Sequence, residues 1–281
     1  MKIFSTMLIL ILLLMSNLYA QRPVSDPKHE NHYSVETIET DDLVIEFKNA
    51  HSQHQFTIVN VNIKNKSSDY IYFKGSESKF KYAHGDYSPV GSLVSKIDFF
   101  IEPNGSASKT LKVSGDSKFH VEQLKLELSG FYRINPKGDK TLTAADFQLP
   151  ASKNSFSAGD CNCSLEKSSQ TTKETSAKFN CKYQGKDLLI LDPTKLSVKV
   201  KKSPENIFAN DNRKDKAEII FPGGDYKFTA EFHIPGKTAD MQFSVLDVVW
   251  NDTFVQAKMI PIKIPSVNFV FDDGMTLLKN Q

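Results

Sequence analysis

The sequence predicts an all-β chain that folds into two consecutive antiparallel β-sandwiches. From Leu43 onward, apolar and polar residues alternate with a period of two, as they do in strands that bury one face. Turn-forming residues interrupt these runs at short intervals, and no window has the spacing of a long amphipathic helix. The length of 281 residues is enough for roughly two domains. With 40% hydrophobic and 24% charged residues, the composition excludes a disordered chain.

The first twenty residues have the pattern of an export signal. Lys2 supplies a positive charge, residues 7–15 are an unbroken apolar run, and residues 16–20 end it with polar and small side chains. As a helix this run would be only about 14 Å long, which is too short to cross a bilayer. We therefore expect a signal peptide over residues 1–20, cleaved after Ala20. We also expect a mature chain without a membrane span, in a secreted or periplasmic location.

A flexible leader is expected next, because residues 21–41 contain two prolines and many polar residues without a sustained period. The first domain is predicted over residues 42–147. Turns at residues 65–68 and 102–105 separate its strands. The predicted strands cover residues 43–47, 59–63, 69–73, 96–101, 109–113 and 124–128.

The second domain is predicted over residues 155–270, because the pattern of the first domain recurs there at an offset of 118 to 120 residues. Such self-similarity favours a duplication, and it places Trp250 at a core position. We expect the two domains to join near residues 148–154, where the apolar period lapses, and residues 271–281 to form a C-terminal tail. The matched positions are residues 59–61 with 179–181, Asp69 with Asp187 and Pro103 with Pro222.

Each half has a strand, a turn rich in Asn or Gly, further strands and then a Pro-x-Gly turn. In the first half, the turn at Asn65 leads to residues 80–82 and 85–87 and then to the Pro-x-Gly turn at 103–105. In these features the chain resembles the small immunoglobulin-like domains of exported bacterial proteins, over residues 42–134 and more loosely over 157–262. The resemblance implies two consecutive immunoglobulin-like antiparallel β-sandwiches. It implies no reaction, because function resides in sites that differ among proteins of one fold.

The cysteines Cys161, Cys163 and Cys181 are the first group with possible site chemistry. Export permits disulfides, and an odd number of cysteines leaves at least one thiol unpaired within the chain. Cys161 and Cys163 lie two positions apart and share one face of a strand, so in an antiparallel hairpin either of them can oppose Cys181. We therefore expect a Cys163–Cys181 or a Cys161–Cys181 disulfide beside a buried thiol, or three reduced core thiols.

A thiolate site for Cu(I) or Zn(II) is the alternative interpretation of these cysteines, because they offer three soft ligands. A fourth ligand is missing nearby in the sequence, so we assign no metal site. Histidine pairs give the second possible metal signal, at His29 with His32 and at His51 with His54. Their spacing suits a helix, and neither segment has a helical period, so we interpret them as surface histidines.

No catalytic residue and no cofactor is predicted. The sequence lacks the Gly-x-Ser-x-Gly motif of many hydrolases. Removal of the signal peptide would take Lys2 from the 35 basic residues, which leaves a near balance with the 33 acidic residues. This balance lacks the basic excess of a nucleic-acid-binding protein.

Tyrosines offer the best candidate contacts for a ligand. Tyr82 and Tyr87 lie in a predicted strand-and-loop region, where exposed rings would suit a glycan or a protein surface. We expect an exported, non-enzymatic module that binds, adheres or assembles through strand edges and loops, with another exported protein as partner. The alternatives are a carbohydrate-binding protein that uses Tyr82 and Tyr87, and a metal-handling protein that uses Cys161, Cys163 and Cys181.

Overall fold

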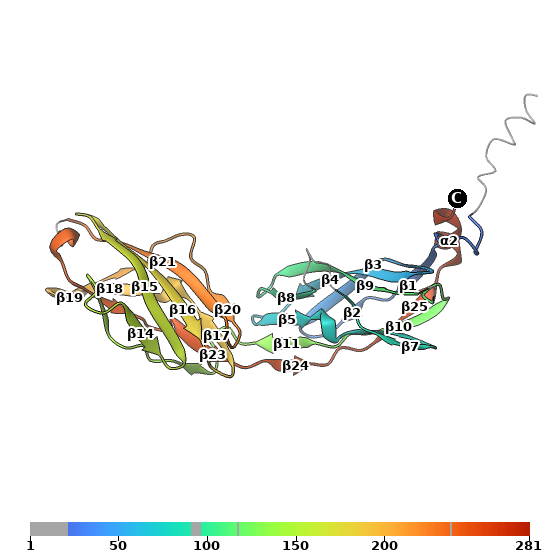
Figure 1. Ribbon diagram of the computed structural model, residues 1–281, viewed down its shortest axis with the longest axis horizontal. Coiled ribbons are helices and arrows are strands. Elements are labelled where there is room, and N and C mark those ends of the chain that lie inside the picture. Colours follow the sequence, from blue (N-terminus) through green and yellow to red (C-terminus); the bar gives the residue numbers. More distant parts are fainter. Residues whose placement is uncertain (1–21, 91–96, 117, 237) are drawn as a thin grey trace, which may run out of the picture. The chain divides into compact units, whose positions relative to one another are not determined.

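The computed structural model describes residues 22–90, 97–116, 118–236 and 238–281 (Figure 1). The described residues form an all-β protein, and its sheets are antiparallel. The signal peptide predicted at residues 1–20 lies outside the described residues. Within the described ranges, no helix has both the length and the apolar character that crossing a membrane requires.

The chain divides into two compact units. Unit 1 comprises the described residues up to Arg133 together with Pro261–Gln281, and unit 2 comprises Ile134–Ile260. The predicted domains, 42–147 and 155–270, therefore differ from the structure in their boundaries. The predicted tail at 271–281 differs as well, because the C-terminal segment returns to unit 1 and pairs there with strands from the start of the chain.

Unit 1 contains a nine-stranded sheet in the order β7-β6-β10-β25-β1-β3-β4-β9, with β2 paired to β3. A second sheet has the order β24-β11-β5-β8, and the buried side chains of both sheets form one hydrophobic cluster. The large sheet contains β1 (Asn31–Val35), β2 (Ile38–Glu39), β3 (Leu43–Gln53), β4 (Phe56–Asn65), β6 (Lys79–Tyr82), β7 (Gly85–Tyr87), β9 (Ser106–Ser114), β10 (Gln123–Glu127) and β25 (Val267–Phe271). The smaller sheet contains β5 (Tyr70–Lys74), β8 (Asp98–Ile101), β11 (Phe131–Ile134) and β24 (Ile260–Ile262).

The predicted flexible leader at residues 21–41 is wrong, because β1 and β2 lie within it. β1 pairs with β3 on one side and with β25 on the other, and its Tyr33 side chain is buried. Local sequence could not show this, since only Tyr33 and Val35 of the five β1 residues are apolar and one partner strand lies at the far end of the chain.

Unit 2 contains three four-stranded sheets, in the orders β12-β23-β17-β20, β13-β22-β18-β19 and β14-β15-β16-β21. The strands are β12 (Lys140–Thr141), β13 (Phe147–Leu149), β14 (Ser155–Ala158), β15 (Cys161–Gln170), β16 (Glu174–Tyr183), β17 (Leu188–Leu191), β18 (Ser197–Val200), β19 (Ser203–Ala209), β20 (Glu218–Ile220), β21 (Asp225–His233), β22 (Leu246–Val249) and β23 (Phe254–Ala257). The described helices are η1 (Gly75–Glu77), η2 (Pro193–Lys195), η3 (Met241–Phe243) and α2 (Asp273–Lys279).

The segment at 148–154, predicted as the join between domains, lies inside unit 2. It connects β13 to β14, which belong to different sheets. Pro150 follows β13 directly, and proline has no backbone N–H with which to continue a strand ladder. The lapse in apolar period therefore marks a change of sheet within one unit rather than a boundary between two.

The two units have corresponding strand orders. The order β1-β3-β4-β9 in unit 1 corresponds to β14-β15-β16-β21, and the order β25-β10-β6-β7 corresponds to β13-β22-β18-β19. The remaining sheets correspond as β24-β11-β5-β8 and β12-β23-β17-β20. In unit 2, β12, β13 and β14 follow one another along the chain. In unit 1, the same three places are taken by β24 and β25 from the end of the chain and by β1 from its beginning.

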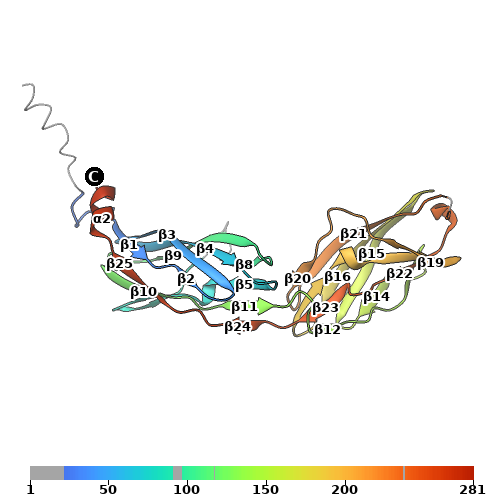
Figure 2. The same ribbon diagram turned by 180° about the vertical axis from the view of Figure 1, so that it is seen from behind.

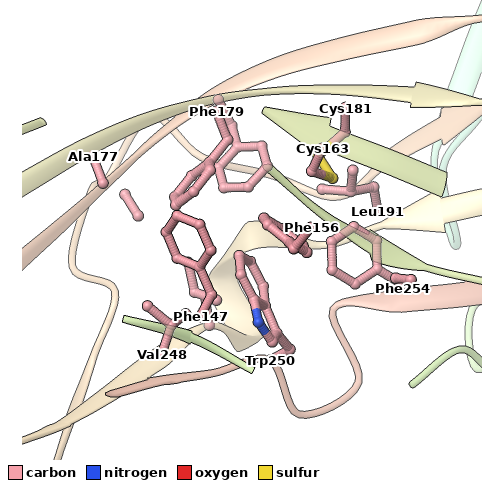
Figure 3. Packing of buried hydrophobic residues seen from close by; sticks show 14 of the residues in the cluster. Phe147, Phe156, Cys163, Ala177, Phe179, Cys181, Leu191, Val248, Trp250 and Phe254 are labelled. Atoms are coloured by element: carbon pink, nitrogen blue, oxygen red, sulfur yellow. A yellow bond between two sulfur atoms is a disulfide. The ribbon is translucent and has the colours of Figure 1, made fainter. Parts of the chain in front are cut away.

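The core of unit 2 is rich in aromatic side chains (Figure 3). Trp250 is buried, and the centroid of its ring lies 4.2 Å from that of Phe156 and 5.6 Å from that of Phe179. Phe147 and Phe254 pack against the same indole. The single tryptophan of the chain is thus a probe of unit 2 alone.

Candidate functional site

The C-terminal segment, residues 261–281, lies in a site built by unit 1. β25 is the central element of this site, with β10 on one side and β1 on the other in both views (Figures 1 and 2). Val270 lies opposite Gln123 of β10 and opposite Ser34 of β1. Phe269 points into the core and is 1% exposed, whereas Val270 points outward and is 60% exposed. The segment therefore completes both the sheet and the core of unit 1.

Polar contacts attach α2 to the beginning of the chain. The Asp272 carboxylate accepts a hydrogen bond from the backbone N–H of Met275 at 2.9 Å, and this contact holds the pKa of Asp272 below its usual value. The Thr276 hydroxyl accepts from the His32 N–H at 3.0 Å. Asn280 accepts from the Glu30 N–H at 3.0 Å and donates to the Glu30 carbonyl at 2.8 Å. The Asp272 contact caps α2, and the contacts of the buried residues Thr276 and Asn280 fix the helix beside the beginning of the chain.

The apolar side chains of α2 point away from these contacts. Met275, Leu277 and Leu278 are exposed, while the polar residues Thr276 and Asn280 are buried. This distribution is the reverse of the usual one for a helix on a protein surface. The segment is thus held in place by hydrogen bonds and by β25, rather than by an apolar helix face.

Five of the seven histidines gather around the beginning of β1. His29 Nδ1 and His120 Nε2 share a hydrogen bond at 2.8 Å, and the ring of His54 stacks on that of His120 with 4.6 Å between centroids. His51 stacks on His32 with 5.3 Å between centroids. Histidines that the sequence places in pairs therefore belong to two separate clusters: His29 and His54 lie with His120, and His32 lies with His51.

Protonation is disfavoured in the cluster of His29, His54 and His120. Burial, together with the nearby imidazoles of His54 and His29, lowers the pKa of His120 to about 4. Burial and the positive charge of Arg22 lower the pKa of His29. The shared hydrogen bond requires at least one of the two rings to be neutral, since one ring nitrogen must accept.

Acidification is therefore expected to destabilise unit 1. An unfolded His120 takes up a proton as the pH falls through 6.5, whereas the folded residue stays neutral until about pH 4. The unfolded state binds more protons in this interval, so stability decreases as the pH falls from 6.5 to 4. Thermal unfolding followed by circular dichroism through this interval measures the effect. His120→Gln should flatten the pH dependence, and an equally steep dependence in that variant would contradict the assignment.

The structure joins Cys163 and Cys181 by a disulfide across the β15–β16 pair, where the two residues lie directly opposite each other (Figure 3). Cys161 is buried and unpaired, with its sulfur 3.9 Å from that of Cys163. Burial raises the pKa of the Cys161 thiol to about 12, so it stays protonated and unreactive. The three sulfurs lie within 4.8 Å of one another, but the disulfide removes two of the thiolates that a metal site would need.

Tyr82 is not an exposed ligand contact, contrary to the prediction. Its side chain is 8% exposed, and its ring packs against Tyr87 and Phe119 with centroids 5.6 and 5.4 Å away. Tyr87 is half-buried in the same cluster. The signal that could have shown this is local, because Phe80 and Tyr82 have the spacing of residues on one face of a strand and both point inward.

Two surface hollows occupy corresponding places in the two units. The hollow of unit 1, about 650 Å³, is lined by β6, β10 and β25, with Lys81, Glu122 and Lys125 among its charged residues. The hollow of unit 2, about 840 Å³, is lined by β18, β22 and β13, with Lys199 and Asp247 among them. The C-terminal segment therefore forms one wall of the unit 1 hollow.

Comparisons with known proteins assign no family to the chain. No protein-family model matches it, and no curated protein matches it. Among solved structures, the crystal structure of AerE from Microcystis aeruginosa aligns with 86% of this chain and 99% of its own length, at 9% sequence identity and a TM-score of 0.11. A similarity at that TM-score supports no inference about fold or activity.

Proposed function

We propose that the chain is an exported, non-enzymatic module of two immunoglobulin-like β-sandwiches that binds or assembles with another exported protein through strand edges. The two units with corresponding antiparallel sheets support this organisation. The apolar run at residues 7–15 supports export to a secreted or periplasmic location.

The single observation that carries the proposal is the edge strand β19. It pairs with β18 on one side, and no strand of the described residues pairs with its other side. Ile207 lies in this strand and is 58% exposed. An unpaired strand edge presents a row of backbone donors and acceptors to which a partner strand can bind.

The edge of β21 shows what a protected edge looks like in the same unit. Glu231 of β21 donates its backbone N–H to the Asn210 side chain at 2.9 Å, and its carbonyl accepts from the Asp211 N–H at 3.0 Å. A loop therefore occupies the position that a partner strand would take on β21. β19 is the edge on which we place the partner.

The proposal that the protein is not an enzyme depends on where the side chains with displaced pKa values lie. Within the described residues, large pKa displacements occur at Tyr33, Tyr82, His120 and Cys161. None of these residues lines the hollow of unit 1 or that of unit 2. Catalytic groups are usually perturbed residues within a cleft, and in the described residues the four large displacements lie outside both hollows.

Capture experiments with the mature chain test the edge. Tagged wild-type protein is expected to recover a stoichiometric partner from the exterior fraction of the native cell, and Ile207→Lys is expected to lose it, because a charge on an edge strand opposes strand addition. Val90→Lys is the matched control, since Val90 is also 58% exposed but lies outside the strands. Equal capture by wild type and Ile207→Lys would contradict the role of β19.

A further inference from the structure

We propose that the C-terminal segment is exchanged between copies of this chain, so that β25 and α2 of one copy occupy the site between β1 and β10 of another. The inference goes beyond the proposed function, because it adds a second copy of the chain as a partner and places it in unit 1, away from β19. Exchange of an identical element is a common route to oligomers, because every contact of the closed monomer is kept.

The first argument is that unit 1 is incomplete without this segment. β25 forms register pairs with Tyr33, Ser34 and Val35 on one side and with four residues of β10 on the other. Removing it would leave two unpaired strand edges and expose the core around Phe269. Such edges bind a matching strand, whichever chain supplies it.

The second argument comes from the comparison of the two units. Unit 2 takes β12, β13 and β14 from one continuous stretch of chain. Unit 1 takes β24 and β25 from the end of the chain and β1 from its beginning, so its equivalent stretch is divided between the two ends. The acceptor site and the segment that fills it are therefore separated by an entire unit in the sequence, and the segment of a second copy fits the site equally well.

The third argument is the connection that precedes β25. Residues 258–266 are exposed or half-buried throughout, and β24 within this stretch is held by its pairing with β11. Pro261 and Pro265 favour an extended backbone there. β24, together with Ile262 and Ile264 that pack against the core of unit 1, would therefore pass to the neighbouring copy along with β25 and make the same contacts there.

Cross-linking tests the exchange, with two variants that each add one cysteine to a Cys161→Ala chain, which keeps the Cys163–Cys181 disulfide and has no other free thiol. Gln123→Cys and Val270→Cys change exposed residues that lie directly opposite each other in β10 and β25. The two variants are purified separately, refolded together from denaturant and treated with a short thiol cross-linker. Exchange is expected to shift the mixture from monomer to dimer on a denaturing, non-reducing gel, because only a swapped segment brings the two cysteines together.

Two controls accompany this test. Gln123→Cys with Val270→Cys in one chain should cross-link internally when refolded at high dilution, which shows that the two positions can react. Asn60→Cys mixed with Thr110→Cys should give no dimer, because these opposed residues lie in β4 and β9, within the continuous part of unit 1. Absence of the Gln123–Val270 dimer, or an equal dimer yield from Asn60 and Thr110, would overturn the exchange.

The outcome also separates this inference from the proposed function. If wild-type protein captures a different exported protein in an Ile207-dependent way while the mixed variants stay monomeric, the edge-binding function stands and the exchange is wrong. A dimer that forms equally well with Ile207→Lys would place assembly at the C-terminal segment rather than at β19.

Discussion

Replacing Phe269 with Ala is expected to lower the free energy of unfolding of unit 1 by about 3–5 kcal/mol, the usual cost of truncating a buried phenylalanine. The side chain is fully buried in the centre of the nine-stranded sheet. Its ring packs against Tyr33 and Phe80, with centroids 5.6 and 6.1 Å away. Loss of these contacts leaves a cavity between segments from the start, the middle and the end of the chain.

The two units can be followed separately in this experiment. Trp250 is the single tryptophan and lies in unit 2, so its fluorescence reports on that unit, whereas circular dichroism reports on both. Phe269→Ala should move the dichroism transition of unit 1 to lower denaturant and leave the fluorescence transition in place. The strand was predicted to belong to the second domain, which would require the opposite result.

Val270→Ala is the matched control for Phe269→Ala. The two residues are neighbours in β25, but the Val270 side chain is 60% exposed, so its truncation should change stability by no more than about 0.5 kcal/mol. Equal losses in the two variants, or a shift of the tryptophan transition by Phe269→Ala, would show that β25 is not the buried central strand of unit 1.

The local sequence predicted where strands form, but it did not predict which strands pair with one another. Alternation at residues 43–47 and 59–63 predicted two strands that the structure contains within β3 and β4. The alternation of Val267, Phe269 and Phe271 is equally compatible with either unit, because a period of two shows which face is buried and not which strand lies alongside. Chain continuity then favoured the second domain, and the actual partners lie more than a hundred residues away.

The site around β1 and the C-terminal segment was not predicted either, because its residues are also far apart in the sequence. His29 and His120 are 91 residues apart in the sequence and meet only because β1 lies beside β3 and near the segment that precedes β10. The disulfide was easier to anticipate, because Cys163 and Cys181 lie on two strands joined by a short hairpin. Local pairing is encoded within a few tens of residues, whereas the site of the C-terminal segment depends on both ends of the chain.

Removing the Cys163–Cys181 disulfide is expected to destabilise unit 2 by about 3 kcal/mol, which the chain-entropy model gives for a loop of this length. The two cysteines are 18 residues apart, and the bond links β15 and β16 within the core cluster that contains Trp250. Cys181→Ala should therefore move the fluorescence transition of Trp250 to lower denaturant. A reducing agent should move the wild-type transition in the same direction.

Cys161→Ala distinguishes the effect of losing the disulfide from the effect of losing a buried sulfur atom. Cys161 is as deeply buried as Cys181 but forms no disulfide, so its replacement removes packing without changing the cross-link. Its cost should be well below that of Cys181→Ala, and a reducing agent should still shift the transition of this variant. If the two replacements cost the same, or if the reducing agent leaves the wild-type transition unmoved, the cross-link contributes nothing and the cysteines act only as small core side chains. The larger loss in Cys181→Ala is expected because the bond restricts the unfolded chain, which is a contribution that packing cannot replace.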